Sequence, residues 1–210
     1  MTFSPRLAAL ALAATLATPA VAQGVPGSVD PAAVQAGTYA TDPAHSLVRW
    51  SVSHFGFNPY WGSFGDIEGT LTMDPTNLEG ASVDVTIPIG SLVTVSEGLR
   101  EHMLRPGKDG GDPDFFGPDA ADARFVSTRV RLTGPTSAMI RGDFTLNGVT
   151  RPIAIAAEFT GVGTNPMSQA ETVGFTGRAV IKRSEFGIAT FVPMISDEVT
   201  LTISAAFERQ

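Results

Sequence analysis

The sequence lacks cysteine altogether and has few positive charges. Without cysteine, the chain has neither a disulfide framework nor a thiol for nucleophilic chemistry. Its 14 Lys and Arg residues stand against 21 Asp and Glu residues, which leaves a net charge of −7, and the positive residues form no cluster along the chain. Binding to nucleic acid or to an anionic membrane surface depends on clustered positive charge, so the sequence excludes both kinds of partner.

The residue patterns of familiar catalytic and metal sites are missing too. The three histidines, His45, His54 and His102, have neither H-x-H nor H-x-x-x-H spacing, and no G-x-S-x-G motif occurs. Asp66 and Glu68 are two residues apart, a spacing that suits a solvated stripe on a strand better than a pair of catalytic carboxylates. We therefore expect no catalytic residue, no metal site and no cofactor. A metal site that only the fold assembles from distant histidines is the alternative.

One long apolar run occurs, at the start of the chain. Residues 7–16 are almost all Leu and Ala, Arg6 precedes them, and residues 20–22 form a small-x-small site. The run is shorter than the ~20 residues that cross a bilayer, which favours a cleaved signal peptide over a retained anchor. We expect residues 1–22 to be the signal peptide of an exported protein.

The rest of the chain divides into a short lead-in and one domain. Residues 23–36 mix Gly, Pro, Ser and Ala without periodicity, so we expect a flexible segment. From residue 37 to residue 210 the dominant hydrophobic period is two, which is typical of strands with one buried face. The clearest alternations cover residues 83–89, 153–159, 173–181 and 199–207.

Turn signals between these segments indicate hairpins. Asn147-Gly148 is the strongest, because both residues tolerate the positive φ that a two-residue hairpin requires. Residues 74–77 and 133–136 contain turn-forming residues as well. Short connections join antiparallel neighbours, and we count about eight to nine strands. We expect an all-β fold, since a sheet of this size closes into a barrel or folds into a sandwich to remove its edges.

One segment departs from the strand pattern. Ser96 is a good N-cap, and Leu99 and Met103 share one helical face, so residues 96–104 should form a short amphipathic helix. A loop rich in Gly and Asp follows and leads to Phe115-Phe116. Such an insertion suits a lid over a barrel mouth, or a crossover that plugs the barrel end.

Several stretches, taken together and in order, resemble the YceI-like family of periplasmic polyisoprenoid-binding proteins. The resemblance covers almost all of residues 38–208. Each stretch alone is a weak signal, but the ordered set is specific. The stretches are YATDPAHS at 39–46, VRWSVSHFG at 48–56, GSFGDIEGTL at 62–71, REHML at 100–104, DFF at 114–116, ARFVST at 123–128, GDFTLNGVTRP at 142–152 and KRSEFGI at 182–188.

The resemblance implies a lipocalin-like antiparallel β-barrel of about eight strands with one short inserted helix. It also implies a periplasmic carrier or store that holds a polyisoprenoid lipid, such as an isoprenoid quinone or a polyprenyl lipid, without catalysis. Two departures concern the rim of the pocket. Residues 105–113 insert a Gly-rich stretch before the Phe pair, and Gly117-Pro118 replaces the usual acidic residue after it.

The apolar side chains give the candidate binding site. The chain has 13 Phe residues against two Tyr and two Trp, and Phe can line a dry tunnel because it leaves no polar atom unpaired. Core filling is the competing explanation, since a barrel of about eight strands is either packed with side chains or hollow. The ligand-binding candidates are Trp50, His54, Phe144, Phe175 and Ile181 facing inward, Phe55, Phe57, Leu99, Met103, Leu104, Phe115 and Phe116 at the mouth and lid, Phe186 and Phe191 in the last connection, and Phe64.

Two other functions compete with the lipid carrier. One is an enzyme that acts on an apolar substrate in the same pocket, with His102 or the Asp66 and Glu68 pair as acid and base. The other is a stress-response structural module with a filled barrel. As partners we expect a long-chain lipid, no nucleic acid, and transient contact with a membrane or a membrane protein for loading. Monomer and homodimer are both open.

Overall fold

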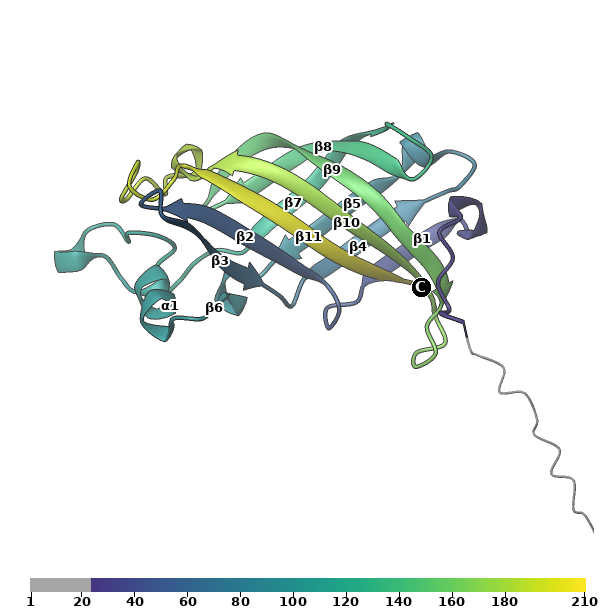
Figure 1. Ribbon diagram of the computed structural model, residues 1–210, viewed down its shortest axis with the longest axis horizontal. Helices are drawn as coiled ribbons and strands as arrows, with labels where there is room; N and C mark the ends of the chain where they lie inside the picture. The colour runs from purple at the N-terminus through teal and green to yellow at the C-terminus, as the bar shows by residue number, and fades with distance from the viewer. Residues whose placement is uncertain (1–23) are drawn as a thin grey trace, which may run out of the picture.

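The computed structural model describes residues 24–210, so the expected signal peptide lies outside the described residues. Within the described part, the chain forms an elongated β-structure with α1 at one end and both ends of the described chain at the other (Figure 1). The strands are β1 Gly37–Thr41, β2 Leu47–His54, β3 Asn58–Phe64, β4 Glu68–Met73, β5 Ser82–Ile87, β6 Val93–Thr94, β7 Ala123–Leu132, β8 Ser137–Leu146, β9 Val149–Thr164, β10 Glu171–Lys182 and β11 Glu198–Arg209. The helix is α1 Glu97–Leu104, and 3-10 turns cover Pro31–Ala33, Leu78–Gly80, Ile89–Ser91, Lys108–Gly110 and Arg183–Phe186.

Eight of these strands in the described chain close into an antiparallel barrel. Their order is β1-β4-β5-β7-β8-β9-β10-β11, and β11 returns to β1 through the pairs Tyr39 with Arg209 and Thr41 with Phe207. Closure through β1 and β11 removes the free edges that an open sheet of these eight strands would have. The predicted all-β, lipocalin-like barrel with one short helix is therefore confirmed for residues 24–210.

Strands β2, β3 and β6 branch from the barrel wall. β11 pairs with β1 only near its C-terminal end and pairs with β2 through residues 200–204. Along the first half of β11, β2 and β3 therefore continue the wall in place of β1. β6 adds a short outer strand to β3, beside α1 (Figure 1). We call the end that carries α1 the mouth of the barrel.

Local sequence explains the connections at the hairpins and the helix. Asn147 and Gly148 both have positive φ, 51° and 75°, as a type I′ turn between β8 and β9 requires. The Ser96 hydroxyl accepts a hydrogen bond from the Leu99 amide at 3.2 Å, which caps the first turn of α1. The predicted hairpin and the predicted helix are both confirmed.

Two local expectations were wrong. The alternation at residues 83–89 does not continue as a strand, because Pro88 lacks an amide hydrogen and β5 ends at Ile87. Asp66 lies before β4 with φ 50°, so it is not on the same strand face as Glu68. The two carboxylates therefore do not form the stripe that their spacing indicates.

The lead-in packs against the end of the barrel opposite the mouth. Ser28 and Val162 exchange two backbone hydrogen bonds of 2.8 Å, and Val34 is buried. The Gln35 amide donates to Glu171, whose carboxylate also accepts from the buried Tyr39 hydroxyl at 2.6 Å. These contacts hold residues 28–35 against the end of the barrel opposite the mouth, where we expected a flexible segment.

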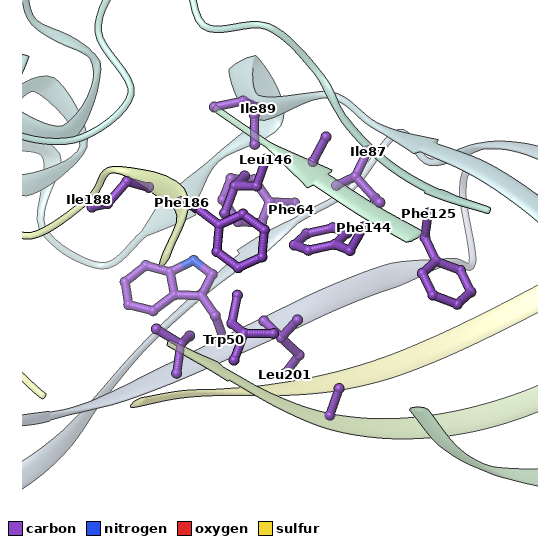
Figure 2. Close-up of a cluster of buried hydrophobic side chains, with 14 of the residues drawn as sticks. Trp50, Phe64, Ile87, Ile89, Phe125, Phe144, Leu146, Phe186, Ile188 and Leu201 are labelled. Carbon is purple, nitrogen blue, oxygen red and sulfur yellow. The ribbon is translucent and has the colours of Figure 1, made fainter. Parts of the chain in front are cut away.

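The buried apolar residues form two clusters, one toward each end of the barrel. The mouth cluster contains Trp50, Phe64, Phe144 and Phe186, whose rings lie among aliphatic side chains (Figure 2). The far cluster is built around the fully buried Tyr39 and the strand ends near it. Between the two clusters the barrel is hollow, as described next. No helix within residues 24–210 is long and apolar enough to cross a membrane.

Candidate functional site

A cavity of about 580 Å³ occupies the interior of the barrel. Its wall extends from Leu78 and Met73 at the far end to Phe55, His102 and Phe191 at the mouth. β11 has 12 residues, which at ~3.3 Å per residue and a tilt of ~40° corresponds to a barrel roughly 30 Å tall. The cavity is therefore long and narrow, the shape that an extended chain fills.

Strand register creates the hollow. Ala138 pairs with Ala157, Ala157 pairs with Gly177, and Gly177 pairs with Ile203, so small residues from three neighbouring strands lie at one level of the wall. All four positions line the cavity. Ile155 and Ile203 line the same space and are only partly buried; both side chains lie against Gly177, where an added Cβ would come within 3.3 Å of each. The interior is a lined channel and not a packed core.

Most of the residues that the sequence nominated lie on the wall of this cavity. They lie on the barrel strands, on α1 and on the loops at the mouth. The nominated residues that line it are Trp50, His54, Phe55, Phe64, Leu99, Met103, Phe115, Phe116, Phe144, Phe175, Ile181 and Phe191.

Three nominated residues lie elsewhere. Phe57 is at the tip of the β2–β3 turn and is 87% exposed, because Phe55 and Gly56 with positive φ turn the chain outward there. Phe186 is 1% exposed and packs against Phe144, with ring centroids 5.5 Å apart, behind the cavity wall. Leu104 packs against the mouth cluster without lining the cavity.

Sequence reasoning missed much of the aliphatic wall. The alternating segments 83–89, 153–159 and 199–207 already marked five of these positions, but the choice favoured aromatic side chains. The missed wall residues include the aliphatic Val83, Val85, Ile140, Ile153, Ile155, Ile195 and Ile203 and one aromatic residue, Tyr60.

The helix and the Phe115-Phe116 segment form one unit over the mouth. The Phe116 amide donates to the Met103 carbonyl at 3.0 Å, and His102 Nε2 lies 2.8 Å from Asp114 Oδ2. The hydrogen bond with His102 holds the pKa of the Asp114 carboxyl below its ordinary value, and Arg105 reinforces the shift. These contacts tie the loop to α1, so the two move or stay together.

Aromatic rings complete the cover of the mouth. Phe116 packs edge-on against Phe64, with centroids 6.0 Å apart. Phe115, His102 and Phe191 form a triangle of rings, with Phe115 5.4 Å from His102 and 6.4 Å from Phe191 and with 6.1 Å between His102 and Phe191. Because Phe115, Phe116 and Phe191 also line the cavity, the cover is part of the wall. The segment that we expected to be a lid or a plug therefore covers the mouth of the barrel.

A buried guanidinium holds the other side of the mouth. Arg183, 5% exposed, donates to four backbone carbonyls of the connection between β10 and β11. The acceptors are Ser196 at 3.0 Å, Ile188 at 3.0 Å, Thr190 at 2.8 Å and Ile195 at 3.0 Å. This single side chain therefore sets the shape of residues 187–196, and with it the position of Phe191.

Two hydrogen-bond donors on the cavity wall have no partner among the described residues. They are Trp50 Nε1 and Tyr60 Oη, on neighbouring strands with ring centroids 6.2 Å apart. The Trp50 indole lies across Gly62, where any Cβ would clash with it. An unpaired buried donor costs free energy, and a rotation of the Tyr60 or Trp50 side chain that brings the donor to a ligand oxygen would relieve that cost.

The histidines do not converge. His45 bonds to Asp42 at 2.6 Å in the turn after β1, while His54 packs edge-on against Phe55 and His102 bonds to Asp114. Within residues 24–210 no group of three or more His, Asp or Glu side chains lies close enough to hold a metal ion. The chemistry that the wall offers is contact with apolar surface.

Residues 39–207 match the family model described as a YceI-like domain. The chain belongs to the YceI-like family. This confirms the resemblance that the ordered sequence stretches indicated. A UPF0312 protein of Ectopseudomonas mendocina is 35% identical over 178 residues, which are 83% of this chain and 89% of the relative. A UPF0312 protein of Pseudomonas aeruginosa is 34% identical over 205 residues, 97% of each chain.

Solved structures share the fold of this YceI-like chain. BcnA of Burkholderia cenocepacia superposes with a TM-score of 0.67 at 22% identity, over 79% of this chain and 98% of BcnA. The Campylobacter jejuni YCEI protein gives 0.61 at 28% identity, over 71% and 84%. A Saccharophagus degradans domain described as polyisoprenoid-binding gives 0.56 at 12% identity, over 82% and 98%.

Proposed function

We propose that this YceI-like protein is a non-catalytic carrier that holds a long apolar lipid of the polyisoprenoid class, such as an isoprenoid quinone or a polyprenyl lipid. The observation that carries the proposal is the long apolar cavity of about 580 Å³ inside a closed barrel. The Saccharophagus degradans domain that shares the fold is described as polyisoprenoid-binding, which supports the same ligand class. The signal peptide expected at residues 1–22 supports a periplasmic location.

The physics of such binding needs no directional bond. Each methylene moved from water into an apolar channel contributes about 0.8 kcal/mol, so a few isoprene units suffice for tight binding. Affinity should increase with chain length until the channel is full. A carrier of this kind selects its ligand by length and flexibility, with a small contribution from the headgroup.

The direct test is mass spectrometry of an organic extract of the protein purified from its native periplasm. A stoichiometric polyisoprenoid would support the carrier. An extract without lipid, from protein that is folded, would favour the structural module. Chemical conversion of the bound lipid during incubation would favour the enzyme if the His102→Ala variant lost that conversion. His102 is the residue to change because it lines the mouth and is our candidate acid or base.

Truncation of the lid should speed ligand release. Phe115→Ala with Phe116→Ala removes two rings from the cover of the cavity, and ~1.4 kcal/mol of lost burial already corresponds to tenfold in affinity. We expect lipid affinity to fall about tenfold or more, chiefly through faster dissociation measured by stopped-flow transfer to vesicles.

The stability of the ligand-free protein discriminates the lid from core filling. A Phe→Ala change in a packed core typically costs ~3–5 kcal/mol, and the lid variant should lose less than that per ring. Urea unfolding of the ligand-free variant measures this loss. A full core-sized loss with an unchanged dissociation rate would show that the two rings are structural filling.

The unpaired donors predict a preference for lipids that carry oxygen. Tyr60→Phe removes one donor without changing the shape of the ring, and one neutral hydrogen bond contributes about 0.5–1.5 kcal/mol. We expect roughly three- to tenfold weaker binding of a polyprenyl quinone and unchanged binding of squalene, a hydrocarbon, in the same fluorescence titration. Equal effects on both lipids would refute the hydrogen bond.

A further inference from the structure

Exposed apolar side chains gather on two loops outside the mouth. The β2–β3 turn presents Phe55 and Phe57, and the connection before β11 presents Phe191, Val192 and Met194. We call these five residues the mouth tip. Met194 is 53% exposed and Phe57 87%, so their apolar surface lies in water when the protein is free in solution.

Hydrogen bonds join the two loops into one surface. The Phe55 amide donates to the Met194 carbonyl at 2.8 Å, and the Ser196 amide donates to the Ser53 carbonyl at 3.0 Å. An isolated bridge between His54 and Ile195 lies between these contacts. The loops lie at the same end of the barrel as α1 (Figure 1). The mouth tip is therefore a built feature of the fold, in which each loop braces the other.

The mouth tip carries no charge on a protein that is strongly acidic. Residues 186–196 contain no Asp, Glu, Lys or Arg, and residues 50–65 contain none either, with His54 as the sole titratable histidine there. The whole chain has a net charge of −7. This distribution does not match an anionic or a cationic partner surface. It matches an uncharged apolar medium that needs no counter-charge.

The outside of the mouth tip is continuous with the cavity. Phe55 and Phe191 are partly exposed to solvent and also line the cavity wall. An isoprenoid tail that passes between them exchanges one apolar environment for another. A carrier that takes its ligand from a bilayer requires such a dry path, because each methylene exposed to water on the way raises the barrier.

We propose that the mouth tip inserts into the apolar region of a lipid bilayer and that the protein loads and unloads its ligand there. This inference rests on the proposed carrier function and adds to it the surface and the partner. Insertion is shallow and driven by apolar side chains, so it requires neither basic residues nor anionic lipids. A second copy of the chain seated on the mouth tip would instead block access to the cavity.

The test compares two matched double variants of the full mature chain. Phe57→Ser with Met194→Ser removes apolar surface from the mouth tip at two positions that do not line the cavity. Val25→Ser with Met167→Ser is the control, because these residues are 88% and 90% exposed and lie at the far end of the barrel. Thermal unfolding of both variants verifies that they fold as the wild type does.

The probe is a vesicle of phosphatidylcholine, assayed by flotation. We expect wild type and control to float with the vesicles, and the mouth-tip variant to partition at least about tenfold less, as loss of apolar burial at two positions predicts. Raising the salt from about 0.1 M to about 1 M should leave wild-type binding unchanged, because screening weakens only charge attraction. Equal partitioning of the two variants, or binding that salt abolishes, would overturn the proposal.

Two further readouts separate this proposal from its alternatives. Sedimentation equilibrium measures the oligomeric state. A dimeric wild type and a monomeric mouth-tip variant, together with no flotation of the wild type with vesicles, would assign the surface to a second copy and overturn the proposal. Lipid extracted from each purified variant reports on the carrier function independently. If all variants retain lipid but float equally well, docking fails and the carrier stands, whereas a wild type that never retains lipid refutes the carrier itself.

Discussion

Ala157→Trp is expected to weaken binding of a long polyprenyl lipid by at least about 100-fold and to leave the ligand-free protein as stable as the wild type or more so. Ala157 lines the cavity, and its small partners on the two neighbouring strands, Ala138 and Gly177, line it at the same level. An indole there would divide the channel. If the chain loses contact for four methylenes, at about 0.8 kcal/mol each, the affinity changes by more than 100-fold.

The neighbouring residue provides a matched control for this substitution. Ala156 lies on the same strand with its side chain outside the barrel, where it is exposed. Ala156→Trp should leave lipid affinity unchanged in a fluorescence titration. A short isoprenoid that fits between the mouth and residue 157 should still bind to Ala157→Trp.

Unfolding in urea decides whether the barrel is hollow. Added side-chain volume costs typically 1–3 kcal/mol in a packed core, whereas in an empty channel it adds contacts without strain. If Ala157→Trp destabilises the ligand-free protein by this amount and leaves lipid affinity unchanged, the barrel is packed. That result would favour the structural module over the carrier.

Arg183→Met should destabilise the protein by about 3 kcal/mol or more. The substitution keeps the apolar stem of the side chain but removes the guanidinium that donates to four carbonyls, and each buried polar group left unpaired costs roughly 1–3 kcal/mol. The carbonyls at the edge of the loop regain water, so the losses do not add fully. Lipid dissociation should also accelerate, because Phe191 loses the loop shape that places it over the cavity.

Lys182 offers the comparison for Arg183. It is the preceding residue and is also positive, but its side chain is exposed. Lys182→Met therefore removes the same charge without disturbing a buried network, and it should change the free energy of unfolding by less than about 0.5 kcal/mol. Arg183→Lys should be intermediate, since an ammonium group cannot reach four carbonyls at once. The free energy of unfolding from urea titration measures all three. Equal stability of Arg183→Met and Lys182→Met would contradict the clamp.

The local elements of this protein were predictable because their signals are local. Asn147-Gly148 specifies its hairpin through backbone angles that few other residue pairs tolerate, and Ser96 begins α1 through a hydrogen bond three residues away. Alternating hydrophobicity marks strands such as β9 and β11 without reference to any neighbour. The ordered motifs identified the YceI-like family, and with it the barrel.

Choosing the wall residues was harder than choosing the strands. Phe57 and Phe186 look alike in the sequence, yet one projects into solvent and the other lies behind the wall of the cavity. Period two assigns a residue to one of two faces, but it does not say whether the inner face meets a cavity, a packed side chain or a turn. The preference for aromatic rings then omitted Ile155 and Ile203, which form more of the wall than Phe57 does.

The all-β class, the hairpin at residues 147–148, the position of α1 and the family followed from local patterns in the chain. The hollow interior did not follow from them, because it depends on which residues of different strands share one level. Ala138, Ala157 and Gly177 are far apart in the chain and become one layer through strand register alone. The Arg183 clamp and the apolar mouth tip arise in the same way, since both require segments distant in sequence to meet at one end of the barrel.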